Sequence, residues 1–160
     1  MNRPETAAAS ASSQPEPRPW LLRRRVLPQH TDHAGVAWHG AYVAWLEEAR
    51  VEALAAVGLA YSDLSARGCE LPVVALAIDY RQALLHGDLV VIQSWAEPRR
   101  GLKLPWRSRL LDGAGRLVAE ARVDLVLVAV DTAAGARRLQ RRLPPDLAHA
   151  VEALAAGPAD

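Results

Sequence analysis

Residues 30–50, HTDHAGVAWHGAYVAWLEEAR, change from a polar loop to an amphipathic helix. The apolar positions of this helix are 42, 45, 46, 49, 53, 56 and 57. Their three- and four-residue spacing predicts a helix that packs one face against a flat surface and ends at Gly58. The charged residues Glu47, Glu48, Arg50 and Glu52 lie off this face. The rest of the chain must therefore supply a sheet.

Outward from the helix, the sequence is typical of strands joined by tight turns. The expected strands are 20–27, 72–80, 89–97, 102–111 and 116–130, and a short helix is expected from Pro145 to about Ala155. Tight turns make neighbouring strands antiparallel. We therefore expect an α+β fold, with one long helix on a curved antiparallel sheet of about five strands.

The apolar run of residues 72–80 predicts a strand that is covered on both faces. One long helix covers only one face of a sheet. We therefore expect the chain to pair with a second copy of itself.

The length and the hydrophobic content of the chain indicate one domain with one core. The chain has 160 residues, of which 51% are hydrophobic, and this is enough for one sizeable core. Residues 1–19 are rich in Ala, Ser, Pro and Glu and lack the apolar segment of a signal peptide. We expect a disordered leader at 1–19, a domain at 20–155 and a tail at 156–160.

Charge and cysteine content exclude several classes of function. Nineteen basic residues balance 18 acidic ones, so the total charge gives no field for nucleic acid. The single cysteine allows neither an intrachain disulfide nor a cysteine metal cluster, and it favours a cytoplasmic setting. No apolar run is long enough to span a membrane. The three histidines of the loop, 30, 33 and 39, lack the further ligands that a metal site needs.

Asp32 and His39 are the residues of the opening stretch that could perform chemistry. Asp32 precedes a helix whose first backbone N–H groups have no partner in the helix and can hold a carbonyl oxygen. A carboxylate beside such a carbonyl can attack it or activate water, and His39 could orient the substrate or assist proton transfer. The spacing alone favours a simpler interpretation, in which Asp32 is an ordinary loop aspartate and His39 an ordinary residue at the helix start.

The pattern T-D-H-A-G-V-A-W-H-G-A-Y, followed by W-L-E-E-A-R, resembles the signature of hotdog-fold acyl-CoA thioesterases of the 4-hydroxybenzoyl-CoA thioesterase type. The resemblance covers about residues 20–155. It implies that Asp32 is the catalytic carboxylate, as nucleophile or general base, and that a backbone N–H near His39 polarises the thioester carbonyl. It also implies active sites at a homodimer interface, with dimers that pair into tetramers.

Within this family the chain resembles the cyanobacterial 1,4-dihydroxy-2-naphthoyl-CoA hydrolases of phylloquinone synthesis, which implies an aromatic acyl-CoA substrate. Substrate contacts are then expected from Trp38, Gly40 and Tyr42. Trp45 and Trp106 would also suit an aromatic acyl group. Core packing is the alternative for each of these aromatic residues, and it is favoured for Trp45. Coenzyme A would be part of the substrate, so no cofactor is expected.

Basic residues are needed for the phosphates of coenzyme A. Arg99, Arg100 and Lys103 lie at the turn where the family keeps such contacts. Leu104–Pro105 follows this turn, where the family has a small polar residue.

Three alternatives remain open. A second subfamily places its catalytic glutamate on the long helix, at Glu47 or Glu48 here, but the motif favours Asp32. The substrate could be carried by an acyl carrier protein, which the basic residues would dock. The arginine clusters could instead make the chain a non-catalytic ligand or RNA binder, although no aromatic and basic RNA motif accompanies them.

Overall fold

The computed structural model describes residues 16–131 and 133–159. Its strands are β1 (Trp20–Arg25), β2 (Cys69–Glu70), β3 (Val73–Tyr80), β4 (Leu89–Ala96), β5 (Lys103–Asp112), β6 (Leu117–Val126), β7 (Val128–Asp131) and β8 (Ala136–Leu139). Its helices are η1 (Pro28–His30), α1 (His39–Ala56), α2 (Tyr61–Ala66) and α3 (Pro145–Ala156).

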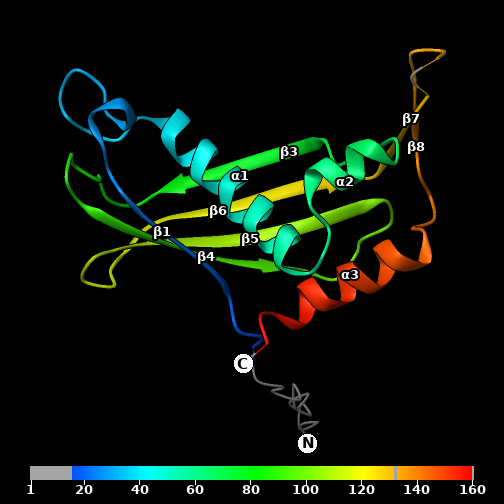
Figure 1. Cartoon of the computed structure of the whole chain (residues 1–160). Coiled ribbons are helices and arrows are strands. Elements are labelled where there is room, and N and C mark those ends of the chain that lie inside the picture. The colour runs from blue at the N-terminus through cyan, green and yellow to red at the C-terminus, as the bar shows by residue number, and fades with distance from the viewer. Residues whose placement is uncertain (1–15, 132, 160) are drawn as a thin grey trace, which may run out of the picture.

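The main sheet has five strands in the order β1-β4-β5-β6-β3, and every neighbouring pair is antiparallel. Helix α1 crosses one face of this sheet, while α3 lies near the end where β4 and β5 connect (Figure 1). The predicted α+β fold, with one long helix on five antiparallel strands, is confirmed.

The core lies between α1 and the sheet, because the predicted apolar face of the helix points inward. Trp45 and Leu46 pack with Ile92 of β4 and Leu110 of β5 near the start of the helix. Trp106 packs in a second cluster with the end of α1 and the inner side of α3. Core packing is therefore the role that the structure shows for both Trp45 and Trp106.

The long strand predicted over residues 116–130 is divided in two. It leaves the main sheet after β6 and continues past Leu127 as β7, which pairs with β2 and β8 in a small second sheet. The β7–β8 hairpin projects beyond the main sheet (Figure 1). This second sheet is not predictable from the sequence pattern, because β2 has only two residues and β8 is rich in arginine.

Strand β3 is an edge of the main sheet, and the prediction that both of its faces are covered is wrong for the single chain. Seven of its eight residues are exposed, including Leu76 at 42% and Tyr80 at 50%. The apolar run is real, and Ile78 and Tyr80 pack toward α1 and the core, but within the described residues no strand pairs with the free side of β3.

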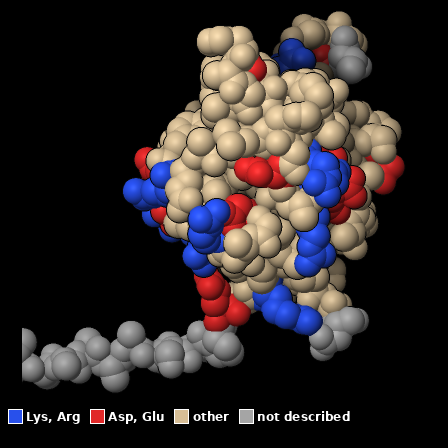
Figure 2. Space-filling model, turned by 90° about the vertical axis from the view of Figure 1, so that its left-hand side faces the viewer, with Lys and Arg blue, Asp and Glu red and all other residues tan. Residues whose placement is uncertain are grey.

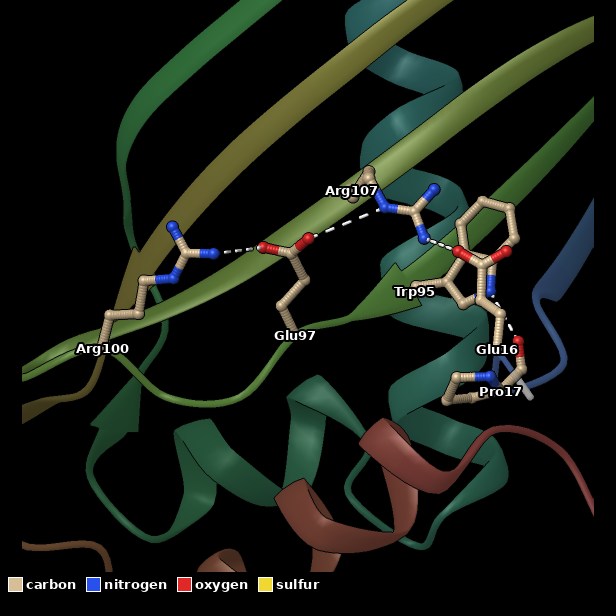
Figure 3. A network of polar contacts seen from close by, with 6 residues as sticks. All are labelled: Glu16, Pro17, Trp95, Glu97, Arg100 and Arg107. Atoms are coloured by element: carbon tan, nitrogen blue, oxygen red, sulfur yellow. Dashed lines mark hydrogen bonds and ion pairs between the residues drawn. The ribbon is translucent and has the colours of Figure 1, made fainter. Parts of the chain in front are cut away.

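Residues 1–15 of the predicted leader lie outside the described residues. Residues 16–19 run beside the sheet, where the indole Nε1 of Trp95 donates a hydrogen bond to the Pro17 carbonyl at 2.7 Å (Figure 3). Glu16 forms an ion pair with Arg107, whose guanidinium stacks over the Trp95 ring at 4.1 Å. Glu16 and Pro17 are thus attached to β4 and β5.

Candidate active site

A tight loop ahead of α1 fixes the carboxylate of Asp32. The backbone N–H groups of Ala34 and Val36 donate to Asp32 Oδ1 at 2.8 and 3.2 Å. Gly35 supplies the turn with a φ of 76°, a conformation that glycine adopts without strain. A bridge between Thr31 and Ala37 closes the loop, so Asp32 is held beside the residues that lead into α1.

The same hydrogen bonds keep Asp32 ionised. Donation from Val36, and then from Ala34, lowers the pKa of the Asp32 carboxyl below its ordinary value, because both bonds stabilise the charged form. Oδ1 is occupied by these two N–H groups, whereas no described residue donates to Oδ2. Asp32 therefore offers an exposed, ionised oxygen at the surface of the loop.

This geometry gives a pH prediction. If Asp32 acts as a carboxylate, the enzyme is active above the folded-state pKa of Asp32. Its activity is lost as the pH falls through that pKa. Since that pKa is lowered, kcat/KM should stay level as the pH falls to the ordinary pKa of aspartic acid, and should decline only below it. A pH–rate profile checks this. A decline centred near neutral pH would instead indicate a catalytic group other than an aspartate.

The start of α1 presents free backbone donors. The N–H of Trp38 donates to the His30 carbonyl at 3.1 Å and is therefore occupied. The N–H groups of His39 and Gly40 follow in the first turn of α1, and the first-turn N–H groups of any helix lack an acceptor inside the helix. No side chain caps this end of α1. These two groups, together with the positive end of the helix dipole, can hold a carbonyl oxygen.

Gly40 is required by the ring of Trp38. A Cβ at Gly40 would lie 2.5 Å from Cζ3 and 2.6 Å from Cζ2 of the indole, so only glycine lets the ring lie over the first turn. The Trp38 side chain is 45% exposed, and its ring contacts the His39 ring edge-to-face with centroids 5.0 Å apart. An exposed aromatic surface therefore stands beside the free backbone donors.

A shallow groove of about 410 Å³ opens next to this turn. It is lined by Val36, Ala37, His39, Tyr42, Tyr80, Arg81, Gln82 and Ala83. Tyr42 is buried and its ring meets that of Tyr80 edge-to-face at 4.9 Å. Burial raises the pKa of Tyr42, so this hydroxyl stays protonated. Tyr80 is not among the predicted site residues, because it lies 38 residues from Tyr42 in the sequence and comes next to it only through folding.

The basic turn lies at the other end of the sheet. The Asp32 loop bonds to residues 84–86, just before β4 begins, whereas Arg99 and Arg100 follow the end of β4 (Figure 1). The eight residues of β4 separate the two places by about 26 Å. One chain therefore does not bring Asp32 and the predicted phosphate contacts together.

Carboxylates and carbonyls already bind the basic residues of this turn. Arg100 pairs with Glu97 at 3.3 Å, and Glu97 also approaches Arg107 at 3.6 Å (Figure 3). Lys103 pairs with Asp124 at 2.7 Å, and Arg99 donates to the Arg141 carbonyl at 2.8 Å. Arg100 and Lys103 remain largely exposed, so both can still reach a phosphate.

The two helix glutamates differ in their surroundings. Glu48 accepts a hydrogen bond from Arg24 Nε of β1 at 2.9 Å, which joins the helix to the edge strand. Glu47 is exposed on the surface. Neither residue lines the groove at the start of α1.

The end of the molecule that carries the Asp32 loop has mixed charge. Basic and acidic side chains lie side by side around uncharged surface, without one large basic patch (Figure 2). Among the described residues, no three His, Cys, Asp or Glu side chains converge as metal ligands. The described helices include none that is long and apolar enough to cross a membrane.

Comparison with known proteins identifies the family. Residues 26–151 match the family model described as the thioesterase-like superfamily. The chain belongs to this superfamily. It is thus a thioesterase by family, as the motif predicts.

Similar proteins are named as esterases or acyl-CoA thioester hydrolases. This thioesterase is 41% identical over 122 residues to "Putative esterase sll0410" of Synechocystis, covering 76% of this chain and 71% of that protein. It is 31% identical over 104 residues to "Acyl-CoA thioester hydrolase YbgC" of Escherichia coli, covering 65% and 78%. The solved structure of Slr0204, a 1,4-dihydroxy-2-naphthoyl-CoA thioesterase from Synechocystis, superposes with a TM-score of 0.72 at 20% identity, covering 84% and 96%. The chain has the hotdog fold.

Proposed function

We propose that this thioesterase hydrolyses an acyl-CoA thioester at the start of α1, with Asp32 as the catalytic residue. The observation that carries the proposal is an ionised carboxylate, fixed through Oδ1, in the loop leading to a helix start with free N–H groups. Nearby, Trp38 and the groove of Tyr42 and Tyr80 offer aromatic walls for the acyl group.

The chemistry divides between the backbone and the side chain. The N–H groups of His39 and Gly40 polarise the thioester carbonyl and stabilise the oxyanion that forms. Asp32 either attacks the carbonyl carbon, giving an anhydride that water hydrolyses, or accepts a proton from the attacking water. In both routes the C–S bond breaks, and one water is consumed for each free acid and each coenzyme A released. His39 is positioned beside the same turn to orient the acyl group.

The acyl group that we propose is aromatic, with 1,4-dihydroxy-2-naphthoyl-CoA of phylloquinone synthesis as the first choice. Support comes from the aromatic lining of the groove and from the named activity of Slr0204. Nothing in this route uses a metal or a cofactor, and coenzyme A enters as part of the substrate. A cytoplasmic location stays a prediction.

A substrate panel tests this proposal. Release of free thiol should be fastest from aromatic acyl-CoA thioesters, slower from acetyl- and butyryl-CoA, and slower still from the same acyl groups on an acyl carrier protein. Faster turnover of the carrier-protein thioesters would favour the alternative substrate. Release at the uncatalysed rate from every thioester would overturn the proposed function.

We further propose that the working unit is a homodimer joined through β3, and that dimers pair into tetramers. The exposed edge of β3 carries Val73, Val74, Leu76 and Tyr80, an apolar edge that a monomer rarely leaves open. The opposite edge, β1, carries Arg23, Arg24 and Arg25, which protect it against pairing. Pairing through β3 also explains the apolar run that one chain leaves uncovered.

In this dimer the basic turn of one copy lies near the Asp32 site of the other. A two-fold axis perpendicular to the sheet pairs two β3 strands antiparallel, so opposite ends of the two copies come together. Arg99, Arg100 and Lys103 of a second copy then lie at the same end of the joined sheet as Asp32 of the first. We propose that they contact the phosphates of coenzyme A there.

A matched pair of edge variants tests the dimer. Leu76→Lys on β3 should yield a monomer, because a charge would be buried at the pairing edge, and thiol release should fall at least tenfold. Leu21→Lys on β1 makes the same change at an exposed leucine of the other edge and should remain dimeric and active. Analytical ultracentrifugation gives the mass. A dimeric Leu76→Lys would contradict pairing through β3.

A further inference from the structure

An arginine-rich surface lies at the end of the molecule that carries the β7–β8 hairpin. Residues 128–142 contain four arginines and a single acidic residue, Asp131, so this short segment concentrates positive charge. The net charge of the whole chain is only +1, which conceals this local excess. The hairpin projects beyond the main sheet (Figure 1), and residues 137–142 are exposed apart from the half-buried Gln140. The excess charge therefore faces solvent.

Three of these arginines have no carboxylate partner among the described residues: Arg138, Arg141 and Arg142. The fourth, Arg137, pairs with Glu70 at 3.1 Å. The backbone also joins this segment to a second basic part of the chain, because Arg99 donates to the Arg141 carbonyl at 2.8 Å. The arginines after the hairpin and the basic turn between β4 and β5 thus form one continuous surface.

The side chains of this surface fit a partner that is anionic outside and apolar beneath. Leu139 lies between Arg138 and Gln140 in the sequence and is 48% exposed. An anionic lipid bilayer offers phosphate headgroups for the arginines and an apolar layer for the leucine. Single-stranded RNA favours aromatic rings on which its bases stack, and residues 128–142 contain none. A folded acidic protein requires a wider, shaped interface than two four-residue strands provide.

We propose that this surface, formed by Arg138, Leu139, Arg141 and Arg142, binds the anionic headgroups of a lipid bilayer and attaches the protein to the membrane surface. The proposal goes beyond thioester hydrolysis and does not depend on it. One basic residue near an anionic leaflet strengthens binding by about fivefold, so three of them contribute about a hundredfold. The attraction acts over about 8 Å at physiological ionic strength, so the attachment is reversible and sensitive to salt.

Co-sedimentation of the full chain with lipid vesicles tests the attachment. At low salt the wild-type protein should sediment with vesicles of phosphatidylcholine and phosphatidylglycerol in equal parts, and should stay in solution with phosphatidylcholine alone. Replacing the three unpaired arginines (Arg138→Gln, Arg141→Gln and Arg142→Gln together) should lower the binding constant by about a hundredfold. The Arg141 carbonyl still accepts from Arg99 in this variant, so thermal unfolding should be unchanged.

A matched triple variant separates the position of the arginines from the total charge. Arg23, Arg109 and Arg122 are exposed on β1, β5 and β6, and they too have no carboxylate partner among the described residues. Changing these three to glutamine removes the same charge and should leave vesicle binding within about twofold of wild type. An equal loss in the two triple variants would overturn the proposal, because total charge would then explain the binding.

Leu139→Ser and competing partners test the chemistry of the surface. Loss of this half-exposed apolar side chain should weaken vesicle binding by about fivefold. Vesicle binding that depends on neither Leu139 nor the three arginines would overturn the proposal. So would no binding of anionic vesicles at low salt. Tighter binding of poly(U) RNA or of an acidic carrier protein than of anionic vesicles, at the same salt, would assign the surface to that partner and also overturn it.

Discussion

Asp32→Asn should lower kcat for thioester hydrolysis by about a thousandfold, since a carboxylate acting as general base or nucleophile contributes on this scale. The fold should persist, because the asparagine Oδ1 can accept the same hydrogen bonds from Ala34 and Val36. Thiol release under saturating substrate measures the effect, and thermal unfolding confirms that the variant is folded.

The chain contains a matched control for this substitution. Asp112 accepts hydrogen bonds from the N–H groups two and four residues later, Ala114 and Arg116, both at 2.9 Å. Asp32 has the same pattern with Ala34 and Val36. Asp112→Asn, in the turn between β5 and β6, should leave the rate within about twofold of wild type. If Asp32→Asn and Asp112→Asn lose activity equally, the loss reflects the role of these aspartates in holding their turns. Catalysis by Asp32 is then contradicted.

Gly40→Ala should have the second largest effect. The added methyl group overlaps the Trp38 indole, which is nearly half exposed and can swing into solvent. Stability should change by less than about 1 kcal/mol, because alanine favours the helix while the ring contact is lost. The substrate wall would be displaced, so kcat/KM should fall by about tenfold to a hundredfold. Tryptophan fluorescence should shift to longer wavelength as the indole becomes hydrated.

Gly113→Ala is the control for this change. The added Cβ would meet Leu89 at an ordinary distance of 3.4 Å, and Gly113 does not need a positive φ. Its activity and fluorescence should match those of the wild-type protein. An active Gly40→Ala variant with a shifted spectrum would show that Trp38 does not line the substrate site.

The sequence predicted the elements that have a clear local signal. The periodic spacing around Tyr42 and the tight turns between strands were sufficient for one helix and five antiparallel strands. The turn at Gly35 and the aspartate before it were recognised through the motif, and the structure adds how the loop holds the carboxylate.

Other features depend on contacts between distant residues. Arg50 was predicted off the buried helix face, yet it is 5% exposed, because its guanidinium donates to the Leu46 carbonyl at 3.0 Å and its stem packs inward. The pairing of Tyr42 with Tyr80 and the distance of Arg99 from Asp32 could not be read from spacing. The apolar run of β3 predicted burial, and in the proposed dimer a second copy of the chain supplies that burial.

The initial rate of free coenzyme A release from an aromatic acyl-CoA measures the proposed thioester hydrolysis at the Asp32 loop. The wild-type protein should release thiol with saturation kinetics, far above the rate without protein. Release that is no faster with the protein than without it, for aromatic and short-chain thioesters alike, would contradict thioester hydrolysis by this protein.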